Sequence, residues 1–247
     1  MIKLKQIIFA LMALMLASQT HAALIEYNGY TLDESTNIVT GGGLEWLRWD
    51  VTLGMNVNTA IADIADGIVD GVNYGVGWSL ASNVHMSSLF NTFGFDAPFA
   101  WDADEQTSQS FDTGSDGAIE DITTDAELQF TAIFGETESF APESSDPVSI
   151  SRALFGNDLD GDLLYNLALV IDDFQSEGGI KNGGVQLLAD NYEANFPDHR
   201  ADVTGVALVR NTNPSHPTRP VSEPSALALF AIGLIAMLRL RRRNIES

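Results

Sequence analysis

The chain of 247 residues contains no cysteine. No disulfide can therefore stabilise the fold, and no thiol is available as a catalytic nucleophile. An apolar core has to hold the folded part together, and the chain is long enough to bury one.

Basic residues are also scarce, with 12 Lys and Arg against 34 Asp and Glu. Six of these basic residues lie near the two ends of the chain. The charged residues outside residues 23–220 are Lys3, Lys5, Glu223, Arg239, Arg241, Arg242, Arg243 and Glu246. Without them, residues 23–220 contain 32 acidic and 6 basic residues, which gives a net charge of −26. Such a surface repels nucleic acid and anionic lipid, so we expect no nucleic-acid partner. It suits a soluble surface in salty surroundings, and it could collect divalent cations.

Few residues are suited to catalysis. The histidines after residue 22 are His85, His199 and His216, and their spacing does not form a metal-binding pair. We expect His85 to have a surface or capping role on a helix. The chain has no Gly-x-Ser-x-Gly motif and no phosphate-binding glycine loop. Paired carboxylates of a glycosidase remain possible, but 32 acidic residues produce close pairs by chance. The sequence therefore predicts a protein that is not an enzyme, with a polysaccharide hydrolase as the alternative.

The N-terminus has the pattern of a signal peptide. Lys3 and Lys5 form a basic segment, Ile7 to Ala17 is apolar, and Thr20-His21-Ala22 offers small residues for signal peptidase. The apolar run is too short to span a membrane. We predict a signal peptide at residues 1–22, cleavage after Ala22, and export of the remaining chain.

The C-terminal part has a different composition. Four of the eight prolines fall between Asn211 and Pro224, which predicts an extended linker at residues 211–220. The tail at residues 221–247 then combines a polar motif, an apolar segment from Ala226 to Leu238, and a basic cluster. We predict that residues 226–238 enter the membrane as a helix, with the arginines on the cytoplasmic side and the preceding chain on the other side.

The tail has a motif and a basic cluster on the two sides of its apolar segment: Val221, Ser222, Glu223, Pro224, Arg239, Arg241, Arg242 and Arg243. In these residues it resembles the PEP-CTERM sorting signal of Gram-negative bacteria, the substrate tag of the membrane protease exosortase. Ser222 stands where the family pattern Val-Pro-Glu-Pro has its first proline. The resemblance implies tethering to the inner membrane, processing by exosortase, and a final place at the cell surface or outside the cell. A permanent single-span anchor is the alternative, although about 20 Å of helix is short against a core of about 30 Å.

Residues 23–210 form the expected folded body, for which we predict one α+β domain with antiparallel strands and two helices. The first helix runs from Asn56 to Ile68, since Val57, Ile61, Ile64 and Ile68 share one face. The second begins after Ser82 as N-cap, buries Met86, Leu89, Phe90 and Phe93, and ends at Gly94.

Strands are expected from shorter patterns. They lie at residues 24–32, with a possible turn at Asn28-Gly29, and at 43–49 after the Gly41–Gly43 turn. In the latter, Leu44 and Trp46 face one side, and Glu45 and Leu47 the other. Further strands are expected at 128–134, 149–156 (strand or turn), 163–171 (a helix being possible) and 203–210. In the last, either Val206 and Leu208, or Val203, Ala207 and Val209, face inward.

The order of these motifs resembles the Lcl-type C-terminal domain, which is similar to the C-type lectin fold. The resemblance rests on Gly43-Leu44-Glu45-Trp46-Leu47-Arg48, on Gly77-Trp78-Ser79-Leu80-Ala81-Ser82, and on Ala207-Leu208-Val209-Arg210. Ser79 and Ala81 replace an Arg and a Pro of the family pattern. The resemblance implies that the first and last strands pair, that the long middle loops form a binding face, and that the domain binds a polymer or mediates adhesion.

Two aspartate-rich segments are candidates for Ca²⁺, a cation that prefers six to eight oxygen ligands. The first is Asn157 to Asp162, in which Asp158, Asp160 and Asp162 alternate, and the second is Asp112 to Gly117. Neither has the EF-hand pattern, and an ordinary Asx-rich turn is the alternative. Among the four tryptophans, we expect Trp46 and Trp78 in the core, and one or two of the others could form a sugar-stacking surface.

The sequence as a whole predicts an exported, exosortase-sorted protein of the cell surface or extracellular matrix, with a role in binding exopolysaccharide or in biofilm. A secreted polysaccharide hydrolase and a purely structural matrix protein are the alternatives.

Overall fold

The computed structural model describes residues 24–101, 108–114, 125–140, 148–156, 164–175, 181–193 and 201–212. The chain divides into two units, residues 1–211 and 212–247, and the elements of the fold belong to the first. The predicted signal peptide, the linker, the sorting tail and its membrane segment lie outside the described residues. Among the residues described, no helix is both long and apolar enough to cross a membrane.

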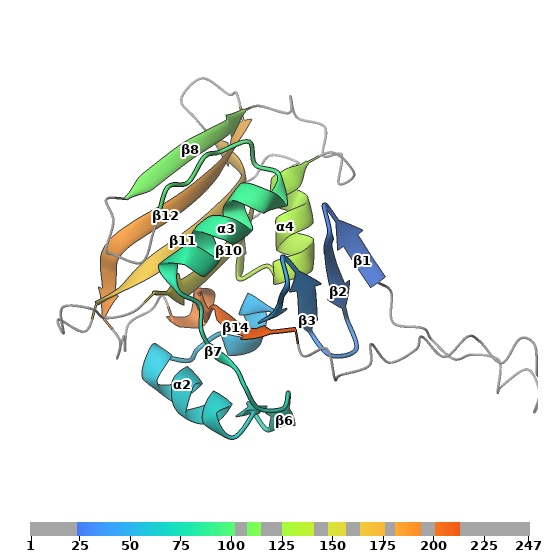
Figure 1. Cartoon of the computed structure of the whole chain (residues 1–247). Coiled ribbons are helices and arrows are strands. Elements are labelled where there is room, and N and C mark those ends of the chain that lie inside the picture. Colours follow the sequence, from blue (N-terminus) through green and yellow to red (C-terminus); the bar gives the residue numbers. More distant parts are fainter. Residues whose placement is uncertain are drawn as a thin grey trace, which may run out of the picture. The chain divides into compact units, whose positions relative to one another are not determined.

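Five strands of the N-terminal half and the last strand of the body build a six-stranded antiparallel sheet in the order β1-β2-β3-β4-β14-β7 (Figure 1). Its strands are β1 (Leu24–Tyr27), β2 (Tyr30–Asp33), β3 (Ile38–Gly41), β4 (Leu44–Leu47), β7 (Ser79–Leu80) and β14 (Leu208–Asn211). The expected strand at 24–32 is in fact a hairpin. Asn28 (φ 49°) and Gly29 (φ 82°) occupy its two turn positions, as the Asn-Gly pair suggested. Gly42 and Gly43 make the corresponding turn between β3 and β4.

The second sheet has the order β13-β10-β11-β12-β8, with β9 also pairing with β10. Its strands are β8 (Gln109–Gly114), β9 (Glu138–Phe140), β10 (Val148–Phe155), β11 (Leu164–Gln175), β12 (Lys181–Glu193) and β13 (Gly205–Val206). The strands expected at 149–156 and 163–171 are confirmed as β10 and β11. A small hairpin, β5 (Ile68–Val69) with β6 (Val72–Asn73), lies beside the first helix.

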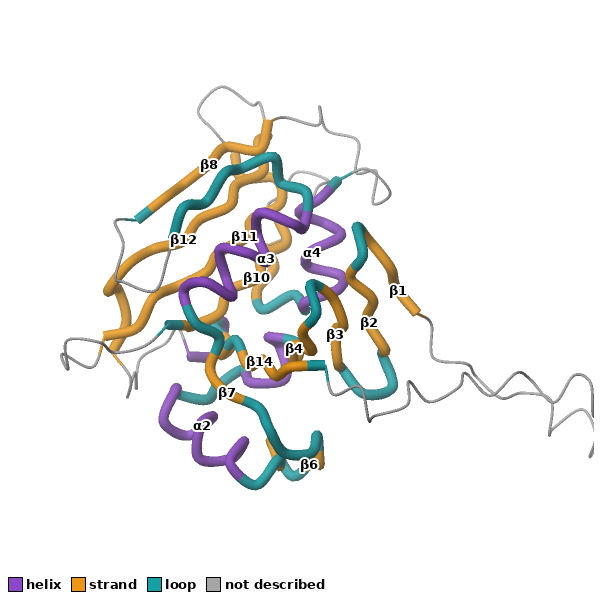
Figure 2. The backbone as a smooth tube through the Cα atoms, viewed as in Figure 1, coloured by secondary structure: helices purple, strands orange, loops and turns teal. Residues whose placement is uncertain are grey.

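Three α-helices accompany the sheets in the described ranges, one more than expected: α2 (Val57–Ala65), α3 (Asn83–Phe93) and α4 (Ala126–Phe134). Two short 3₁₀ turns, η1 (Trp49–Thr52) and η2 (Ala201–Val203), complete the described elements. Helices α3 and α4 lie between the two larger sheets, whereas α2 lies at the other side of β7 and β14 (Figure 2). Both α3 and α4 contribute to one core cluster with residues of both sheets. The α+β class is thus confirmed.

Helix α3 matches its prediction closely. The Ser82 hydroxyl accepts a hydrogen bond from the His85 backbone N–H at 3.3 Å, and the Ser82 N–H donates to His85 Nδ1 at 3.3 Å, which completes a capping box. Gly94 ends the helix in the left-handed region at φ 117°. The four expected core residues of this helix, Met86, Leu89, Phe90 and Phe93, are all at most 1% exposed.

Helix α2 confirms only part of its predicted face. It is capped by Asn56, whose side chain accepts from the Thr59 N–H at 2.8 Å. Val57 and Ile64 are buried, but Ile61 is 40% exposed, and Ala60 occupies the buried position instead. The helix ends at Ala65, so Ile68 falls in β5 and is also exposed.

The strand expected at 128–134 is wrong, because this segment forms helix α4. Asp125 caps it by accepting from the N–H groups of Glu127 (2.9 Å) and Leu128 (3.0 Å). The buried residues of this helix are Glu127, Phe130, Thr131, Ile133 and Phe134, of which 127, 130, 131 and 134 recur at the helical spacing of three, one and three residues. Two of the five are polar, which hides the periodicity in the sequence.

The final strand expected at 203–210 is broken in two. Val206 in β13 belongs to the second sheet and Leu208 in β14 to the first, so the chain changes sheets at Ala207. Val206, Ala207, Leu208 and Val209 are all buried because both sides of this segment are covered. The pairing of first and last strands is also corrected, since β14 pairs with β4 and β7, whereas β1 pairs only with β2 among the described strands.

Gly205 is the tightest point of this crossover. A Cβ on Gly205 would overlap the backbone carbonyl oxygen of Trp49 and would lie 3.0 Å from Thr52 Oγ1. The Thr52 hydroxyl itself accepts from the Val206 N–H at 2.6 Å, which fixes η1 against β13. Only glycine allows this close backbone contact.

We therefore expect Gly205→Ala to lower the free energy of unfolding by about 1–3 kcal/mol or more, because the obstructing atom is backbone and cannot change rotamer. Thermal unfolding of the full-length protein measures the effect. Gly184→Ala in β12 is the matched control, since its nearest neighbour would be the Phe111 carbonyl oxygen at 3.8 Å. Equal midpoints for the two variants would contradict the tight contact.

Candidate functional site

The structure decides part of what was expected of the tryptophans. Trp46, Trp49, Trp78 and Trp101 are 1%, 0%, 7% and 4% exposed. The placement of Trp46 and Trp78 in the core is confirmed. The idea that one or two of the others form an exposed sugar-stacking surface is wrong, because Trp49 packs edge-on against Phe130 and Trp101 lies against Phe155.

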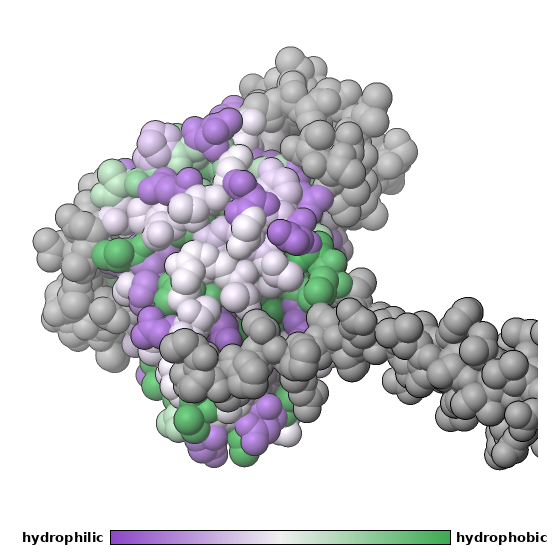
Figure 3. Space-filling model, turned by 45° about the vertical axis from the view of Figure 1, so that its right-hand side comes forward, coloured by the Kyte–Doolittle hydropathy of each residue, from purple (hydrophilic) through white to green (hydrophobic). Residues whose placement is uncertain are grey.

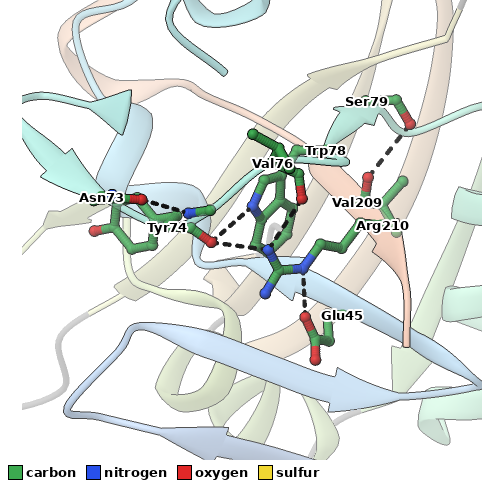
Figure 4. A network of polar contacts seen from close by, with 9 residues as sticks. Glu45, Asn73, Tyr74, Val76, Trp78, Ser79, Val209 and Arg210 are labelled. Carbon is green, nitrogen blue, oxygen red and sulfur yellow. Dashed lines mark hydrogen bonds and ion pairs between the residues drawn. The ribbon is translucent and has the colours of Figure 1, made fainter. Parts of the chain in front are cut away.

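Trp78 carries a polar network together with Arg210 at the end of the closing strand β14 (Figure 4). The Arg210 guanidinium carbon lies 4.3 Å from the centre of the Trp78 ring. Arg210 Nε donates to Glu45 Oε2 at 2.5 Å, and Arg210 Nη1 donates to the Tyr74 carbonyl at 2.8 Å. The Arg210 and Glu45 side chains are 13% and 17% exposed, so the pair is largely shielded from water. This network fixes the closing strand to β4 and to the loop before β7, and its role is structural.

The candidates for metal ligands have different outcomes. Asp158, Asp160 and Asp162 lie outside the described residues. Asp112 lies on β8 and is exposed, whereas its neighbour Thr113 is half-buried. Within the described ranges, no three side chains of His, Cys, Asp or Glu come together in an arrangement that could hold a metal ion. The capping role expected of His85 is confirmed by its place in the Ser82 capping box.

The most unusual polar group of the described body is Glu127, in the first turn of α4. It is only 7% exposed, and its Oε1 atom has no hydrogen-bond partner. The Thr113 hydroxyl of β8 is likewise buried without a hydrogen bond of normal geometry. Both oxygens lie over Gly183 of β12, because a Cβ at Gly183 would be 2.6 Å from Thr113 Oγ1 and 3.0 Å from Glu127 Oε1.

Irregular strand pairing surrounds this point. The register of β12 with β8 shifts between Gly183 and Gly184, which leaves Thr113 as the extra residue. The register of β11 with β12 shifts between Ile171 and Phe174, and the extra residues there include the buried Asp172. Bulges of this kind redirect side chains and are frequent beside functional sites. Here one register shift lies between β12 and β8 and the other between β12 and β11, so the strand that carries Gly183 pairs irregularly with both of its neighbours.

The electrostatic surroundings of Glu127 are negative. Burial, as the largest cause, and the neighbouring Asp125 carboxylate together raise the pKa of Glu127 from its ordinary value of 4.5 to about 7, against the lowering effect of the Thr113 hydroxyl. Burial also raises the pKa of Tyr27, and the charges of Glu127, Asp125 and Asp96 add to that effect. Glu127, Asp125 and Thr113 are therefore called the α4 acidic site.

Sequence reasoning found this site only in part. Thr113 belongs to the aspartate-rich segment from Asp112 to Gly117, but Glu127 and Gly183 were not predicted. The available signal was Asp125-Ala126-Glu127, an acidic start typical of a helix, which the apolar run after it obscured.

Comparison with known proteins decides the nature of the C-terminal tail. Residues 220–243 match the family model described as the PEP-CTERM protein-sorting motif. The chain carries a PEP-CTERM sorting motif. The motif spans the predicted motif residues Val221, Ser222, Glu223 and Pro224 and the arginines from Arg239 to Arg243. Searches of curated proteins and of solved structures found no match to this chain. The resemblance of its body to lectin-like domains thus stays a prediction.

The PEP-CTERM motif establishes the general fate of the protein. It marks an exported chain that is anchored in the membrane before processing and is a target of exosortase. The α4 acidic site lies in the body that is exported.

The buried carboxyl group predicts a pH dependence of stability. The pKa of Glu127 is raised on folding, so the folded state holds a proton that the unfolded chain releases between pH 4.5 and about 7. Stability is therefore full below pH 4.5, falls as the pH rises to about 7, and is lower by at most about 3 kcal/mol above it. We expect Glu127→Gln to lack this fall and to be more stable than the wild type at pH 8, but equally stable at pH 4.5.

Thermal unfolding in the presence of a chelator, at several pH values, provides the measurement. Glu26→Gln, on the exposed face of β1, is the control and should follow the wild type. A Glu127→Gln variant whose midpoint falls in parallel with that of the wild type would show that Glu127 titrates normally.

Proposed function

We propose that this PEP-CTERM protein is an exosortase-processed component of the cell surface or extracellular matrix that binds exopolysaccharide and serves adhesion or biofilm formation. The observation that carries the proposal is the match of residues 220–243 to the sorting motif. A sorting tag gives the body a destination outside the cytoplasm, where polysaccharide is the abundant polymer. The activity we propose for the body is binding rather than catalysis.

The surface of the body supports this role. Figure 3 shows a face on which hydrophilic residues are mixed with residues of intermediate hydropathy, and hydrophobic residues form small separate groups. The exposed large apolar side chains of the described body are Leu24, Ile61, Ile68, Val72, Val76 and Val84. Since all four tryptophans are buried, recognition of a sugar polymer relies on hydrogen bonds from polar side chains rather than on stacking. The acidic surface also suits an acidic polymer that is bridged by divalent cations.

A polysaccharide hydrolase is the second candidate, and Glu127 is the observation that favours it. A glycosidase needs a protonated carboxyl group as general acid, and a pKa of about 7 meets this requirement. The second carboxylate would be Asp125. Against this candidate, Glu127 is 7% exposed, and a sugar ring needs an accessible acid. Binding therefore has the stronger support.

The sorting step predicts the mass of the mature protein. Intact-mass measurement of the protein from its own host, in the cell-bound and medium fractions separately, should give a chain that ends near Ser222 to Pro224, with or without an added group. Cleavage there removes the apolar segment and the arginines. A mass that retains Arg239 to Arg243 in both fractions would instead establish a permanent anchor.

The binding function predicts retention of polysaccharide without turnover. On an array of bacterial exopolysaccharides, the protein should bind at least one polymer, and no reducing sugar should appear during prolonged incubation. Release of reducing sugar that is abolished by Glu127→Gln but retained by Glu26→Gln would establish the hydrolase. Neither binding nor turnover would indicate the purely structural matrix protein.

A further inference from the structure

We propose that the α4 acidic site binds one divalent cation, preferentially Ca²⁺, held by oxygens of Glu127, Asp125 and Thr113. The inference does not depend on the sorting tail or on polysaccharide binding, because it concerns the body alone. It names a site different from the Asp158, Asp160 and Asp162 segment that the sequence suggested.

The first argument is that two buried oxygens from different elements converge on one point. Glu127 Oε1 and Thr113 Oγ1 both lie within 3.0 Å of the point where a Gly183 Cβ would be. Neither forms a hydrogen bond of normal geometry, although the Thr113 hydroxyl is near enough to the Glu127 carboxyl to lower the pKa of that group. A buried oxygen without a well-placed donor destabilises the folded state, and more so if it is charged. A cation between these oxygens would remove that destabilisation.

The second argument is the chemistry of the ligands. A carboxylate and a hydroxyl are hard oxygen donors, which suit Ca²⁺ or Mg²⁺ and not the softer metals. Asp125 adds a second carboxylate beside them, since its Oδ1 atom is 2.9 Å from the Glu127 backbone nitrogen. Both backbone hydrogen bonds of Asp125 use Oδ1, so Oδ2 takes no part in the helix cap, and the Asp125 carboxylate acts directly on the Glu127 carboxyl.

The third argument is the charge around the site. Glu127 and Asp125 lie at the start of α4 and Asp96 lies after α3, yet all three carboxylates act on the hydroxyl of Tyr27. Asp96 is exposed and stands next to the core residue Phe95. Three carboxylates around one point create a negative potential that attracts a cation and repels anions.

Ca²⁺ is favoured over Mg²⁺ by the form of the site. Mg²⁺ requires near-ideal octahedral geometry and releases its water reluctantly, whereas Ca²⁺ accepts irregular ligand sets. The ligands here come from a helix N-terminus and from a bulged strand, which together give an irregular set. Three side chains leave several positions for water, so an affinity in the range of extracellular modules, about 10⁻⁴–10⁻³ M, is expected.

The test is titration of the full-length protein in mild detergent with CaCl₂ at pH 8, by calorimetry and by thermal unfolding. The wild type should bind Ca²⁺ with a rise of its unfolding midpoint by several degrees at 10 mM. Glu127→Gln should weaken Ca²⁺ binding at least tenfold, and Thr113→Val a few fold. Gly183→Ala provides a third variant, because its added methyl group would push the two oxygens apart.

The controls separate the competing explanations. The variant with Asp158→Asn, Asp160→Asn and Asp162→Asn should keep the full Ca²⁺-dependent shift, as should Glu26→Gln. The measured quantity is the difference between midpoints with and without Ca²⁺, so a change in basal stability does not affect the result. Mg²⁺ at equal ionic strength should produce a much smaller shift.

Three results would overturn the proposal. One is the absence of any heat or shift at 10 mM Ca²⁺. Another is a shift that the Asp158, Asp160 and Asp162 variant loses and Glu127→Gln retains, which would place the cation in the other segment. The last is an equal shift with Mg²⁺ in every variant, which would indicate screening of the negative body charge alone.

Discussion

The fold depends on the segment from Gly205 to Asn211, which is shared by the two larger sheets. Its backbone groups are divided between them: the Ala207 N–H donates to the Leu154 carbonyl of β10, while the Ala207 carbonyl accepts from the Ala81 N–H beside β7. Because buried peptide groups require partners, neither sheet can shift at this point without losing a hydrogen bond of the other. The same segment leads out of the body toward the linker and the sorting tail. Arg210 fixes its end through the Trp78 ring and the Glu45 carboxylate, so the part of the chain nearest the tail is also among the best anchored.

The interior is held by packing without disulfides, since the chain has no cysteine, and aromatic rings form much of it. The sheets and helices enclose Phe90, Phe93, Phe95, Phe130 and Phe134, whose ring centres lie 4.4–5.9 Å apart in a continuous set of contacts. Each large ring buries more area than an aliphatic side chain, and tilted or edge-on pairs add about 0.5–1.5 kcal/mol beyond burial. An exported domain without disulfides can obtain its stability in this way, through packing alone.

Local signals in the sequence predicted some elements well. Helix α3 was predictable because its cap Ser82, its apolar face and its terminal Gly94 lie within one short segment and agree with each other. The hairpin at Asn28-Gly29 had similar local information. Helix α4 was not predictable in this way, since Glu127 and Thr131 replace apolar residues on its buried face. The division of the final strand at Ala207 depends on which strands neighbour it, and these lie more than fifty residues earlier in the chain.

The acidic site could not be found from the sequence for the same reason. Thr113, Glu127 and Gly183 come from three separate segments, and only the register shifts on the two sides of β12 bring them together. Once the structure is known, the site stands out because its buried carboxyl group lies beside another acid. The other carboxylates of the described ion pairs face an arginine, as Glu45 faces Arg210 and Asp50 faces Arg48.

Glu127 has no arginine partner in the described body, and its nearest charged neighbour is another acid. A glutamine at position 127 would remove the charge and keep the same shape and helix propensity. A buried carboxylate without a cationic partner lowers the stability of the folded state. In the absence of a ligand, Glu127 therefore contributes nothing to stability at this position next to two bulged strands. A proton can neutralise this group below about pH 7, and a divalent cation can do so above it. Two species therefore compete for the same oxygens. If the cation binds as proposed, the helix that holds the aromatic core is fixed more firmly to the sheet in calcium-containing surroundings outside the cell than in their absence.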